Sequence, residues 1–430
     1  MQKRYRKSNE LIGLAEQLIP LGSQTFSKSR IQYPEGFSPL FLDKGKGGRV
    51  WDVDGNEYVD LVCGLLPVVL GYCDKDIDQA IINQLQKGIT FSLPSTLEMD
   101  LAERLINLIP SAEMVRFGKN GTDATSAAIR LARAFTQRDH VVALGYHGWQ
   151  DWYISSTTRN KGIPSMVGSY THRLQYNNTK VIEEIFQKYN NKIAAVILEP
   201  MNSEEPIAGY LEYLRDITEQ QGTVLIFDEI ITGFRFSLGG AQELFGVTPD
   251  LSCFGKSMGN GMPISAVVGR KDIMKEMHEI FFSGTFGGEA LSLAAAIAVI
   301  DKMQSENVID ALWKKGAYLV SGVSELIDKY KLSNVIKLKG KNPWIILNFI
   351  NHKNGDKDSI KTLFMIEMMR NGVLIQSSHN ICFAHDDIDL NKVLFAYDKS
   401  LSIIKKTLDA GRIEDSLECP VVRPVFQVRG

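Results

Sequence analysis

The chain has 430 residues, of which 44% are hydrophobic and 23% are charged, and its formal net charge is −2. This composition is typical of a soluble globular protein, and the length predicts two domains. A net charge so close to zero gives no electrostatic attraction to nucleic acid or to an anionic membrane, so neither is expected as a partner.

The first part of the chain predicts one helix and one hairpin. Residues 8–19 place apolar side chains at helical spacing until Pro20 ends the pattern. Residues 49–60 read as two short strands around a turn at 54–56. We expect residues 1–70 to form an N-terminal segment that joins a smaller domain.

From about residue 75, predicted helices alternate with short strands that are apolar throughout. Continuous apolar strands are expected where helices cover both faces of a mostly parallel sheet. Residues 71–305 are therefore expected to form a large α/β domain. Its helices are predicted at 76–88, 96–108, 121–135, 179–190, 209–221 and 289–304, and its strands at 114–117, 140–144, 193–198, 223–227, 251–254 and 264–268.

The rest of the chain, residues 306–430, predicts a smaller α+β domain. Its helices are expected at 307–329, 357–371 and 389–409, and its strands at 344–350 and 373–375. The tail at 418–430 alternates apolar residues, and this pattern suits either docking on the body or a neighbouring subunit, or a loose end.

The five cysteines are scattered and contain no Cys-x-x-Cys pair, so neither a disulfide framework nor a structural metal site is expected. The basic N-terminal residues are not followed by an apolar stretch of signal-peptide type. No segment approaches the roughly 20 apolar residues of a membrane span. We therefore expect a cytoplasmic protein with reduced thiols and no membrane partner.

A lysine and an aspartate each follow a predicted strand. Lys256 lies in a glycine-rich turn after strand 251–254, and Asp228 follows strand 223–227. Ligands of open parallel sheets bind at the carboxyl ends of the strands. An amine and a carboxylate in that place suit pyridoxal phosphate, whose aldehyde forms a Schiff base with lysine and whose pyridinium nitrogen pairs with aspartate. Taken alone, Lys256 is more often a surface amine, and Asp228 caps a turn, a role that Glu229 can share.

Two further features follow strand ends. The turn between strand 114–117 and helix 121–135 presents a helix N-terminus and the Thr122 hydroxyl, which suits a phosphate group. A simple turn capped by Asn120 or Thr122 explains this segment about as well. Tyr146 follows strand 140–144, where an aromatic ring either stacks on a planar cofactor or packs against its neighbours. The joint placement of these features favours a cofactor site.

These residues resemble the class III, or subgroup II, pyridoxal phosphate-dependent aminotransferases of fold type I, and most of all glutamate-1-semialdehyde 2,1-aminomutase and its relatives. The similarity covers about residues 10–410 and is strongest between Leu225 and Gly269. There, Phe-Asp-Glu-Ile-Ile-Thr-Gly-Phe-Arg, Phe-Gly-Val-Thr-Pro-Asp-Leu, Gly-Lys and Gly-Met-Pro follow the family order. The resemblance implies a large domain with a mostly parallel seven-stranded sheet, a smaller α+β domain, pyridoxal 5'-phosphate, and a homodimer with shared active sites.

The resemblance also implies a role for each matching residue. Lys256 is expected to hold the cofactor and Asp228 to face its ring nitrogen, so both are predicted catalytic residues. Thr285 is expected to reach the phosphate bound by the neighbouring subunit. No metal is implied. The other expected cofactor contacts are Asn120, Gly121, Thr122, Tyr146, His147 and Ile230.

The positions that face the substrate depart from the aminomutase pattern. Lys28 stands near the place of an arginine that grips a carboxylate, although Arg30 is close enough to substitute. Leu65 replaces a tryptophan, and Glu289 lies where the family has an asparagine. Glu204 stands where many class III aminotransferases have a gate glutamate. Lys28 and Glu204 are therefore predicted substrate contacts, and the small-molecule amino donor and carbonyl acceptor stay unidentified.

The first functional hypothesis is an aminotransferase that moves an amino group from a donor to a keto or aldehyde acceptor through a lysine Schiff base and pyridoxamine phosphate. One alternative is glutamate-1-semialdehyde 2,1-aminomutase, which transfers the amine within one substrate; the altered segment at 283–290 counts against it. Another is a catalytically idle homologue that binds pyridoxal phosphate, against which the intact Lys256 and Asp228 pair counts.

Overall fold

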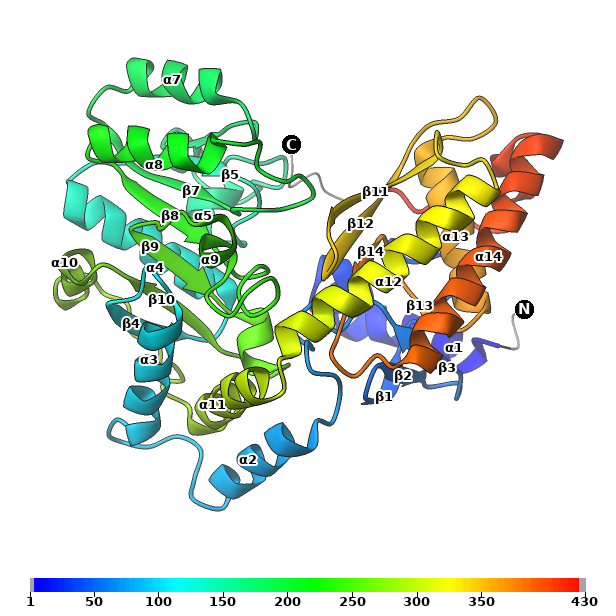
Figure 1. The fold of residues 1–430 in the computed structure, drawn as a ribbon, viewed down its shortest axis with the longest axis horizontal. Coiled ribbons are helices and arrows are strands. Elements are labelled where there is room, and N and C mark those ends of the chain that lie inside the picture. Colours follow the sequence, from blue (N-terminus) through cyan, green and yellow to red (C-terminus); the bar gives the residue numbers. More distant parts are fainter. Residues whose placement is uncertain (1–3, 425–430) are drawn as a thin grey trace. The chain divides into compact units, whose positions relative to one another are not determined.

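The computed structural model describes residues 4–424, which form two compact units (Figure 1). Unit 1 combines the chain up to Asp74 with the chain from Asp310 onward, and unit 2 comprises Lys75–Ile309. These boundaries lie a few residues from the expected domain boundaries at 70/71 and 305/306. The division of the chain into domains of separate function stays a prediction.

Unit 2 is built on a seven-stranded sheet in the order β4-β10-β9-β8-β7-β5-β6. Neighbouring strands from β9 to β6 pair in parallel, whereas β10 is antiparallel to both β9 and β4. The expected mostly parallel seven-stranded sheet is therefore confirmed. Its strands are β4 (Met114–Gly118), β5 (His140–Leu144), β6 (Thr171–Arg173), β7 (Ile193–Leu198), β8 (Val224–Asp228), β9 (Leu251–Phe254) and β10 (Ser265–Gly269).

Helices cover both faces of this sheet (Figure 1). On one face, Val141 and Ala143 of β5 pack in a core with α4 (Gly121–Thr136). On the other face, Val142 and Leu144 pack with α7 (Thr179–Lys188) and α8 (Tyr210–Gln220). Successive strand residues point to opposite faces, so a strand that is covered on both sides must be apolar throughout.

The remaining helices of unit 2 lie before, between and after these strands. The long helix α11 contacts both α2 and α3. A capping box at Ser95 and Glu98 begins α3. These helices are α2 (Lys75–Leu85), α3 (Thr96–Leu108), α5 (Asp151–Ile154), α6 (Ser165–Gly168), α9 (Ala241–Phe245), α10 (Lys271–Met274) and α11 (Ala290–Ser305), with 3-10 turns η4 (Lys256–Gly259) and η5 (Lys275–His278).

Unit 1 contains two small sheets. The first has the order β1-β2-β3-β13, in which only β13 pairs in parallel, and the second has the antiparallel order β11-β12-β14. The predicted hairpin corresponds to β2 and β3, and its turn is closed by a hydrogen bond of 3.0 Å from the Gly55 N–H to the Asp52 carbonyl. The strands are β1 (Leu42–Lys46), β2 (Arg49–Asp52), β3 (Glu57–Asp60), β11 (Ile336–Lys341), β12 (Trp344–Phe349), β13 (Val373–Leu374) and β14 (Ser378–Asn380).

The helices of unit 1 include α13, which packs against α14 and β12 and is buried over most of its length. Of the tail, Val422 is buried, and its N–H donates to the Thr362 hydroxyl at 2.9 Å, so this part docks on α13. Residues 425–430 of the tail lie outside the described residues. The helices are α1 (Arg6–Leu18), α12 (Val308–Lys329), α13 (Lys357–Arg370) and α14 (Asp387–Ala410), with 3-10 turns η1 (Pro20–Gly22), η2 (Phe26–Lys28), η3 (Arg30–Gln32) and η6 (Ile413–Ser416).

Over residues 4–424, no helix combines the length and the apolar character that crossing a bilayer requires.

Candidate active site

Four neighbouring parallel strands of unit 2 end at the same edge of the sheet. Because β5, β7, β8 and β9 lie side by side and run in one direction, the residues that follow them emerge together. Tyr146 lies just beyond β5, Glu199 follows β7, Asp228 ends β8, and Lys256 follows β9. The candidate site is built on this edge.

The turn that precedes α4 is fixed by a carboxylate. Asp123 accepts hydrogen bonds from the backbone N–H groups of Lys119 (3.0 Å) and Asn120 (2.7 Å). Gly121 begins the helix, and a Cβ at this position would lie 3.1 Å from the Ile230 side chain. The helix N-terminus therefore lies close to the end of β8, and its dipole favours an anion there.

Thr122 shows that this turn fits a ligand. Its side-chain oxygen Oγ1 is buried and has no hydrogen-bond partner within residues 4–424. Gly148, at φ +103°, brings its backbone so close that a Cβ there would lie 2.4 Å from Oγ1, so only glycine suits this position. A buried hydroxyl without a partner costs about 1–3 kcal/mol, and a phosphate oxygen is an acceptor that removes this cost. The turn therefore fits the phosphate of the predicted cofactor.

Asp228 is oriented by a histidine. Its Oδ2 lies 2.8 Å from Nδ1 of His147, which carries the proton in this contact, and its Oδ1 accepts the Ile230 N–H at 3.2 Å. Both side chains are buried, and the His147 ring lies parallel to that of Trp152 at a centroid distance of 6.4 Å. A buried carboxylate held in this way suits a protonated ring nitrogen as its partner.

Glu229, the neighbour of Asp228, has a structural role instead. It is fully buried, and it accepts hydrogen bonds from the N–H groups of Ala241 (2.8 Å) and Gln242 (2.9 Å) at the start of α9. Burial raises the pKa of its carboxyl group. Glu229 therefore anchors the chain after β8, while Asp228 lies at the sheet edge with His147.

Lys256 lies in a constrained turn. Its φ of +37° is in the left-handed region, which costs a non-glycine residue about 1 kcal/mol or more. It is half-buried and begins the 3-10 turn η4. At the preceding Gly255, a Cβ would lie 3.1 Å from Ile230 Cδ1, the same side chain that faces Gly121. The turn of Lys256 and the turn before α4 therefore both lie against the Ile230 side chain.

Glu199 holds the segment that carries Tyr146. Its Oε2 accepts the Tyr146 N–H at 3.1 Å, and it lies beside Gly145, whose φ is +113°. The Tyr146 ring is 37% exposed, and it contacts Tyr153 edge to face at a centroid distance of 5.8 Å. Part of the ring is thus accessible for stacking. Glu199 directly follows β7, and the sequence alone did not indicate this role.

An ion pair that the sequence did not predict joins the phosphate-type turn to α11. Lys119 Nζ lies 3.0 Å from Oε2 of Glu289, which also accepts the N–H groups of Leu291 (2.7 Å) and Ser292 (3.3 Å) at the start of the helix. Burial raises the pKa of Glu289, but its hydrogen bonds from Ser292 and Lys119 lower the pKa further, to below its ordinary value. Glu289 is thus an N-cap and an anchor of the site.

Three predicted residues lie in other parts of the structure. Thr285 is exposed in the segment before α11, and Glu204 is exposed between β7 and α8, where its N–H bonds to the Asn202 side chain at 2.9 Å. Lys28 belongs to unit 1, where it lines a cavity of about 410 Å³. Arg30, the alternative to Lys28, is ion paired with Glu16 at 2.6 Å. The roles of Thr285, Glu204 and Lys28 stay predictions.

The chain matches the model of the aminotransferase class-III family over residues 32–403. It is similar to the 3-aminobutyryl-CoA aminotransferase of Cloacimonas acidaminovorans, with 37% identity over 94% of this chain and 99% of that protein. It is also similar to the glutamate-1-semialdehyde 2,1-aminomutase of Thermoplasma volcanium, with 36% identity over 92% of this chain and 99% of that protein.

Solved structures show the same fold. The FumI protein of Sphingopyxis sp. MTA144, solved with pyridoxal phosphate, is similar with a TM-score of 0.87 and 28% identity over 96% of this chain and 100% of that chain. An omega-transaminase from Sphaerobacter thermophilus is similar with a TM-score of 0.85 and 25% identity over 93% of this chain and 98% of that chain. The chain therefore belongs to the class III aminotransferases, the pyridoxal phosphate enzymes of fold type I that its motif order predicted.

Proposed function

We propose that Lys256 carries the pyridoxal phosphate of this class III aminotransferase, and that the enzyme moves an amino group from one small molecule to the carbonyl carbon of another. The observation that carries the proposal is the shared location of Lys256, Asp228 and the buried Thr122 hydroxyl at one sheet edge. When bound there, the cofactor supplies an electron sink for the substrate carbon that loses its proton.

The helix α4 binds the phosphate in this proposal. Backbone N–H groups at Gly121 and Thr122 point from the helix N-terminus, and the Thr122 hydroxyl donates a further hydrogen bond. Asp123 already holds the two preceding N–H groups, so the turn is formed before the anion arrives. A preformed site of this kind binds without a large cost of ordering.

Asp228 keeps a proton on the ring nitrogen of the cofactor. The carboxylate is buried, so its charge acts through a medium of low dielectric constant and stabilises a cation strongly. The hydrogen bond from His147 to Oδ2 fixes the rotamer of Asp228. His147 thus positions the carboxylate and does not need to reach the substrate.

Lys256 moves the proton of the reacting carbon. With the cofactor bound, Nζ of Lys256 would be the base that takes the proton from the reacting carbon of the substrate and the acid that gives it back. The constrained turn at φ +37° holds the start of this side chain in one place. Tyr146, at the same edge of the sheet, is proposed to cover one face of the ring.

Lys28 and Glu204 are proposed as substrate contacts. Lys28 lines the cavity of about 410 Å³ in unit 1, together with Tyr33 and Leu65. Its ammonium group suits an anionic group of the substrate, and Arg30 is already paired with Glu16. The stretch 376–380 contains no acid, whereas the aminomutase segment that it resembles contains a glutamate. In this stretch, Gln376 donates from Nε2 to the Ser27 carbonyl (2.7 Å) and to the Tyr33 hydroxyl (3.0 Å). This difference favours transfer between two substrates.

Intramolecular transfer stays the alternative, because relatives at 36% identity carry the name glutamate-1-semialdehyde 2,1-aminomutase. An aminomutase must retain its intermediate, and we expect the segment 283–290 to do so. In this chain the segment contains Glu289, which forms an ion pair with Lys119 and accepts a hydrogen bond from the Leu291 N–H in α11. A homologue that binds pyridoxal phosphate without catalysing transfer is disfavoured, because both Lys256 and Asp228 are present.

A homodimer is proposed from an exposed apolar patch on unit 2. Leu93 is 79% exposed and Phe281 is 80% exposed. The chain that follows Phe281 comes close to the segment of Leu93: a Cβ at Gly288 would lie 2.5 Å from Glu98 Oε1, and the Ala290 N–H donates to the Ile89 carbonyl at 2.8 Å. Exposed apolar clusters of this kind mark protein interfaces. A second copy would cover this apolar patch and bring its Thr285 to the phosphate of its partner. The apolar patch consists of Ile89, Phe91, Leu93, Met99, Phe281 and Phe286.

A cytoplasmic location is also proposed. The five cysteines form no disulfide within the part of the chain that the structure describes, as expected in a reducing compartment. Fractionation of the producing cells checks this proposal, and recovery of the protein outside the cytoplasm would contradict it.

A donor and acceptor screen tests the proposed activity. Purified enzyme with pyridoxal phosphate is given amino acids and amines with keto acids and aldehydes, including a 3-aminobutyryl thioester as a donor, and products are identified by mass. We expect the aminated acceptor to form only when both substrates are present. Rapid conversion of glutamate-1-semialdehyde without a second substrate would instead show the aminomutase.

A further inference from the structure

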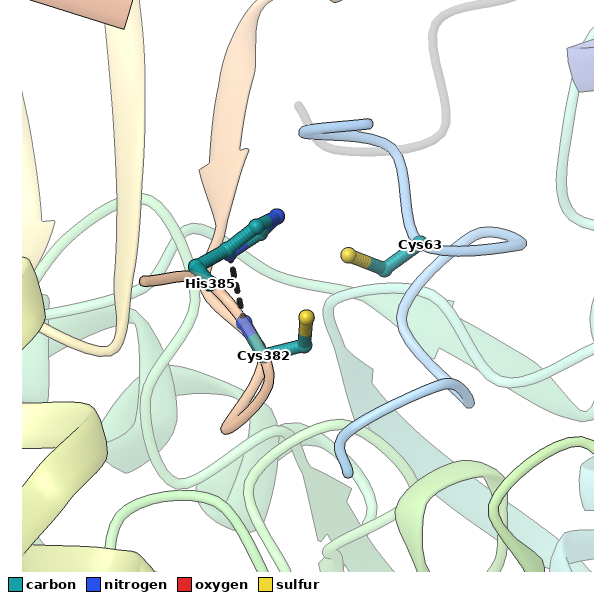
Figure 2. Close-up of side chains that lie close together, drawn as sticks. All are labelled: Cys63, Cys382 and His385. Carbon is teal, nitrogen blue, oxygen red and sulfur yellow. Dashed lines mark hydrogen bonds between the residues drawn. The ribbon is translucent and has the colours of Figure 1, made fainter. Parts of the chain in front are cut away.

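Cys63, Cys382 and His385 lie close together inside unit 1, outside the set of residues that serves the cofactor. The three side chains are buried, and one ligand-type atom from each lies within 4.8 Å of the other two. Figure 2 shows the two sulfur atoms approaching each other from separate segments, with His385 beside Cys382. Cys63 follows β3, and the other two residues follow β14.

The backbone holds the Cys63 thiol toward the second segment. Cys63 has a φ of +47°, and Leu65 (φ +75°) and Leu66 (φ +85°) are also left-handed, so the chain turns sharply after β3. Cys63 Sγ lies 3.0 Å from the Asn380 carbonyl oxygen and 3.2 Å from that of Asp60. The thiol is thus fixed at the junction of the two segments.

His385 ties the same two segments together. Its Nδ1 accepts the Cys382 N–H at 3.1 Å, and its Nε2 donates to the carbonyl of Asp60 at 3.1 Å, across 325 residues of chain. Both ring nitrogens therefore have partners in the fold. A metal ion would have to displace one of them, and the cluster offers three side-chain ligands where a structural zinc site has four. The geometry favours a pair of thiols over a metal site.

We propose that Cys63 and Cys382 form a reversible disulfide in the folded protein, with a hydroperoxide as the oxidant. The Cys382 thiolate attacks one oxygen of the peroxide, which forms a sulfenic acid and releases hydroxide. The Cys63 sulfur then attacks Cys382 Sγ, and the sulfenic hydroxyl leaves with the Cys63 proton as water. The hydroxide takes up the proton that the Cys382 thiol released when it ionised. In total, two thiols are oxidised by two electrons, hydrogen peroxide is reduced to two waters, and a dithiol reverses the reaction.

Two observations assign the attacking role to Cys382. Burial raises the pKa of its thiol, whereas the hydrogen bond with the Cys63 thiol stabilises the Cys382 thiolate and lowers the pKa. Cys63 Sγ lies between the Asp60 and Asn380 carbonyl oxygens, which would repel a thiolate, so Cys63 keeps its proton. A thiolate with a protonated thiol beside it is the arrangement of an attacking and a resolving cysteine.

The route to the pair admits only a small oxidant. Both cysteines are 1% exposed. Their neighbours Val62, Gly64 and Tyr72 line the cavity of about 410 Å³, and Tyr72 also packs against the two cysteines. Because both sulfur atoms are buried, we expect small hydrogen peroxide to reach them more readily than the much larger oxidised glutathione. Hydrogen peroxide should therefore form the bond at least about 10-fold faster than an equal concentration of oxidised glutathione.

The test uses the full chain with its cofactor, treated with hydrogen peroxide, alkylated and digested. We expect a peptide that links Cys63 to Cys382, two hydrogens lighter than the sum of its parts, and its disappearance after dithiothreitol. Cys73 is exposed and serves as the internal control for oxidant. If Cys73 is oxidised while the linked peptide is absent, the proposal is wrong.

Two variants test the order of attack. In Cys63→Ser, the sulfenic acid on Cys382 should persist long enough to be trapped by dimedone, whereas in Cys382→Ser the Cys63 thiol should stay reduced. Trapping on Cys63 instead would overturn the assignment. Measurement of zinc in the purified protein adds a second check: one equivalent of zinc per chain, with both thiols resistant to peroxide, would show a metal site instead. If neither variant folds, the linked peptide in the unmodified protein decides.

Discussion

The Thr122 hydroxyl is buried without a hydrogen-bond partner in the described residues. We therefore expect it to destabilise the protein without cofactor and to stabilise the protein that has bound the cofactor. We expect Thr122→Val to weaken pyridoxal phosphate binding about 10-fold, because a hydrogen bond to a charged group contributes about 1.5 kcal/mol or more. Without cofactor, the same variant should be as stable as the unmodified protein or more stable, because the unsatisfied hydroxyl is gone. Cofactor titration and thermal unfolding of both forms check this. Equal losses of stability with and without cofactor would contradict it.

Asp228 and Glu229 are adjacent carboxylates with different environments. Replacing each by its amide should therefore have different effects, on kcat at Asp228 and on Tm at Glu229. Asp228→Asn keeps the shape of the side chain but loses the charge beside the ring nitrogen, and we expect kcat to fall by about 100-fold or more with little change in Tm. Steady-state kinetics and thermal unfolding measure this. Transfer at the unmodified rate in Asp228→Asn would remove Asp228 from the proposed mechanism.

Glu229→Gln is the matched comparison. The Glu229 carboxylate holds the first N–H groups of α9, so its amide should lower Tm while the absorbance of the bound cofactor stays unchanged in the folded fraction. Thermal unfolding and visible spectra separate the two effects. A stable Glu229→Gln enzyme with an altered cofactor spectrum would mean that Glu229 acts on the ring and not on the helix.

At the scale of elements, Glu289 joins the start of α11 to Lys119 in the phosphate-type turn. Removal of its charge in Glu289→Gln should destabilise the protein by about 1 kcal/mol at neutral pH. The folded-state pKa of Glu289 lies below its unfolded value, so the contribution is fully present above about pH 4.3 and is lost as the pH falls through the folded pKa. The Tm difference between the two proteins should therefore be constant near neutrality and disappear in acid.

Thermal unfolding across this pH range checks the prediction, with Glu212→Gln as a control at an exposed position of α8. A Tm difference for Glu289→Gln that grows as the pH falls would contradict the sign of the pKa shift. A difference of the same size for Glu212→Gln would show a general effect of net charge.

The long apolar elements of unit 2 could be predicted from the sequence. All six residues of β7 are buried, which gives a continuous apolar run in the sequence. The helix α4 buries one apolar face against the sheet, which gives apolar residues at helical spacing. Missed strands are short or polar: β6 and β14 have three residues each. Pairing with β5 and β12 orders them, and three-residue segments carry no period of their own.

The lysine-rich strand β11 was missed for another reason. Its alternation of Ile336 and Leu338 with lysines is the pattern of an edge strand, on which exposed lysines discourage pairing with other chains. Lysine-rich segments are also common in loops, and the sequence alone did not separate the two. In the folded chain, antiparallel pairing with β12 makes this segment a strand.

The candidate site could be predicted only in part. Lys256 and Asp228 each follow a buried strand, so topology alone brings them to one edge. The Lys119 and Glu289 pair spans 170 residues, and neither residue has a pattern that names its partner. The backbone approach of Gly148 to Thr122 likewise depends on how the loop after β5 packs on the start of α4.

At the scale of the whole molecule, the apolar patch around Leu93 predicts self-association. Leu93→Glu places a charge in the proposed interface, so the variant should sediment as a monomer and lose most of its activity if Thr285 of the partner completes the site. Ile388→Glu is the control, because Ile388 of α14 is also largely exposed, at 69%. Analytical ultracentrifugation with an activity assay checks both variants. A monomeric unmodified protein, or an active monomer of Leu93→Glu, would contradict the shared site.

In the proposed reaction, Lys256 carries the cofactor, and the amino group passes between two separate substrates in two half-reactions. The most direct test follows the visible absorbance of the bound cofactor in a stopped-flow cell, with one substrate at a time. We expect the amino donor alone to remove the band of the lysine-bound cofactor and the carbonyl acceptor alone to restore it. Lys256→Ala should show neither change, while Lys275→Ala should behave as the unmodified protein. A band that no donor changes, or one that cycles equally well in Lys256→Ala, would contradict the proposed reaction.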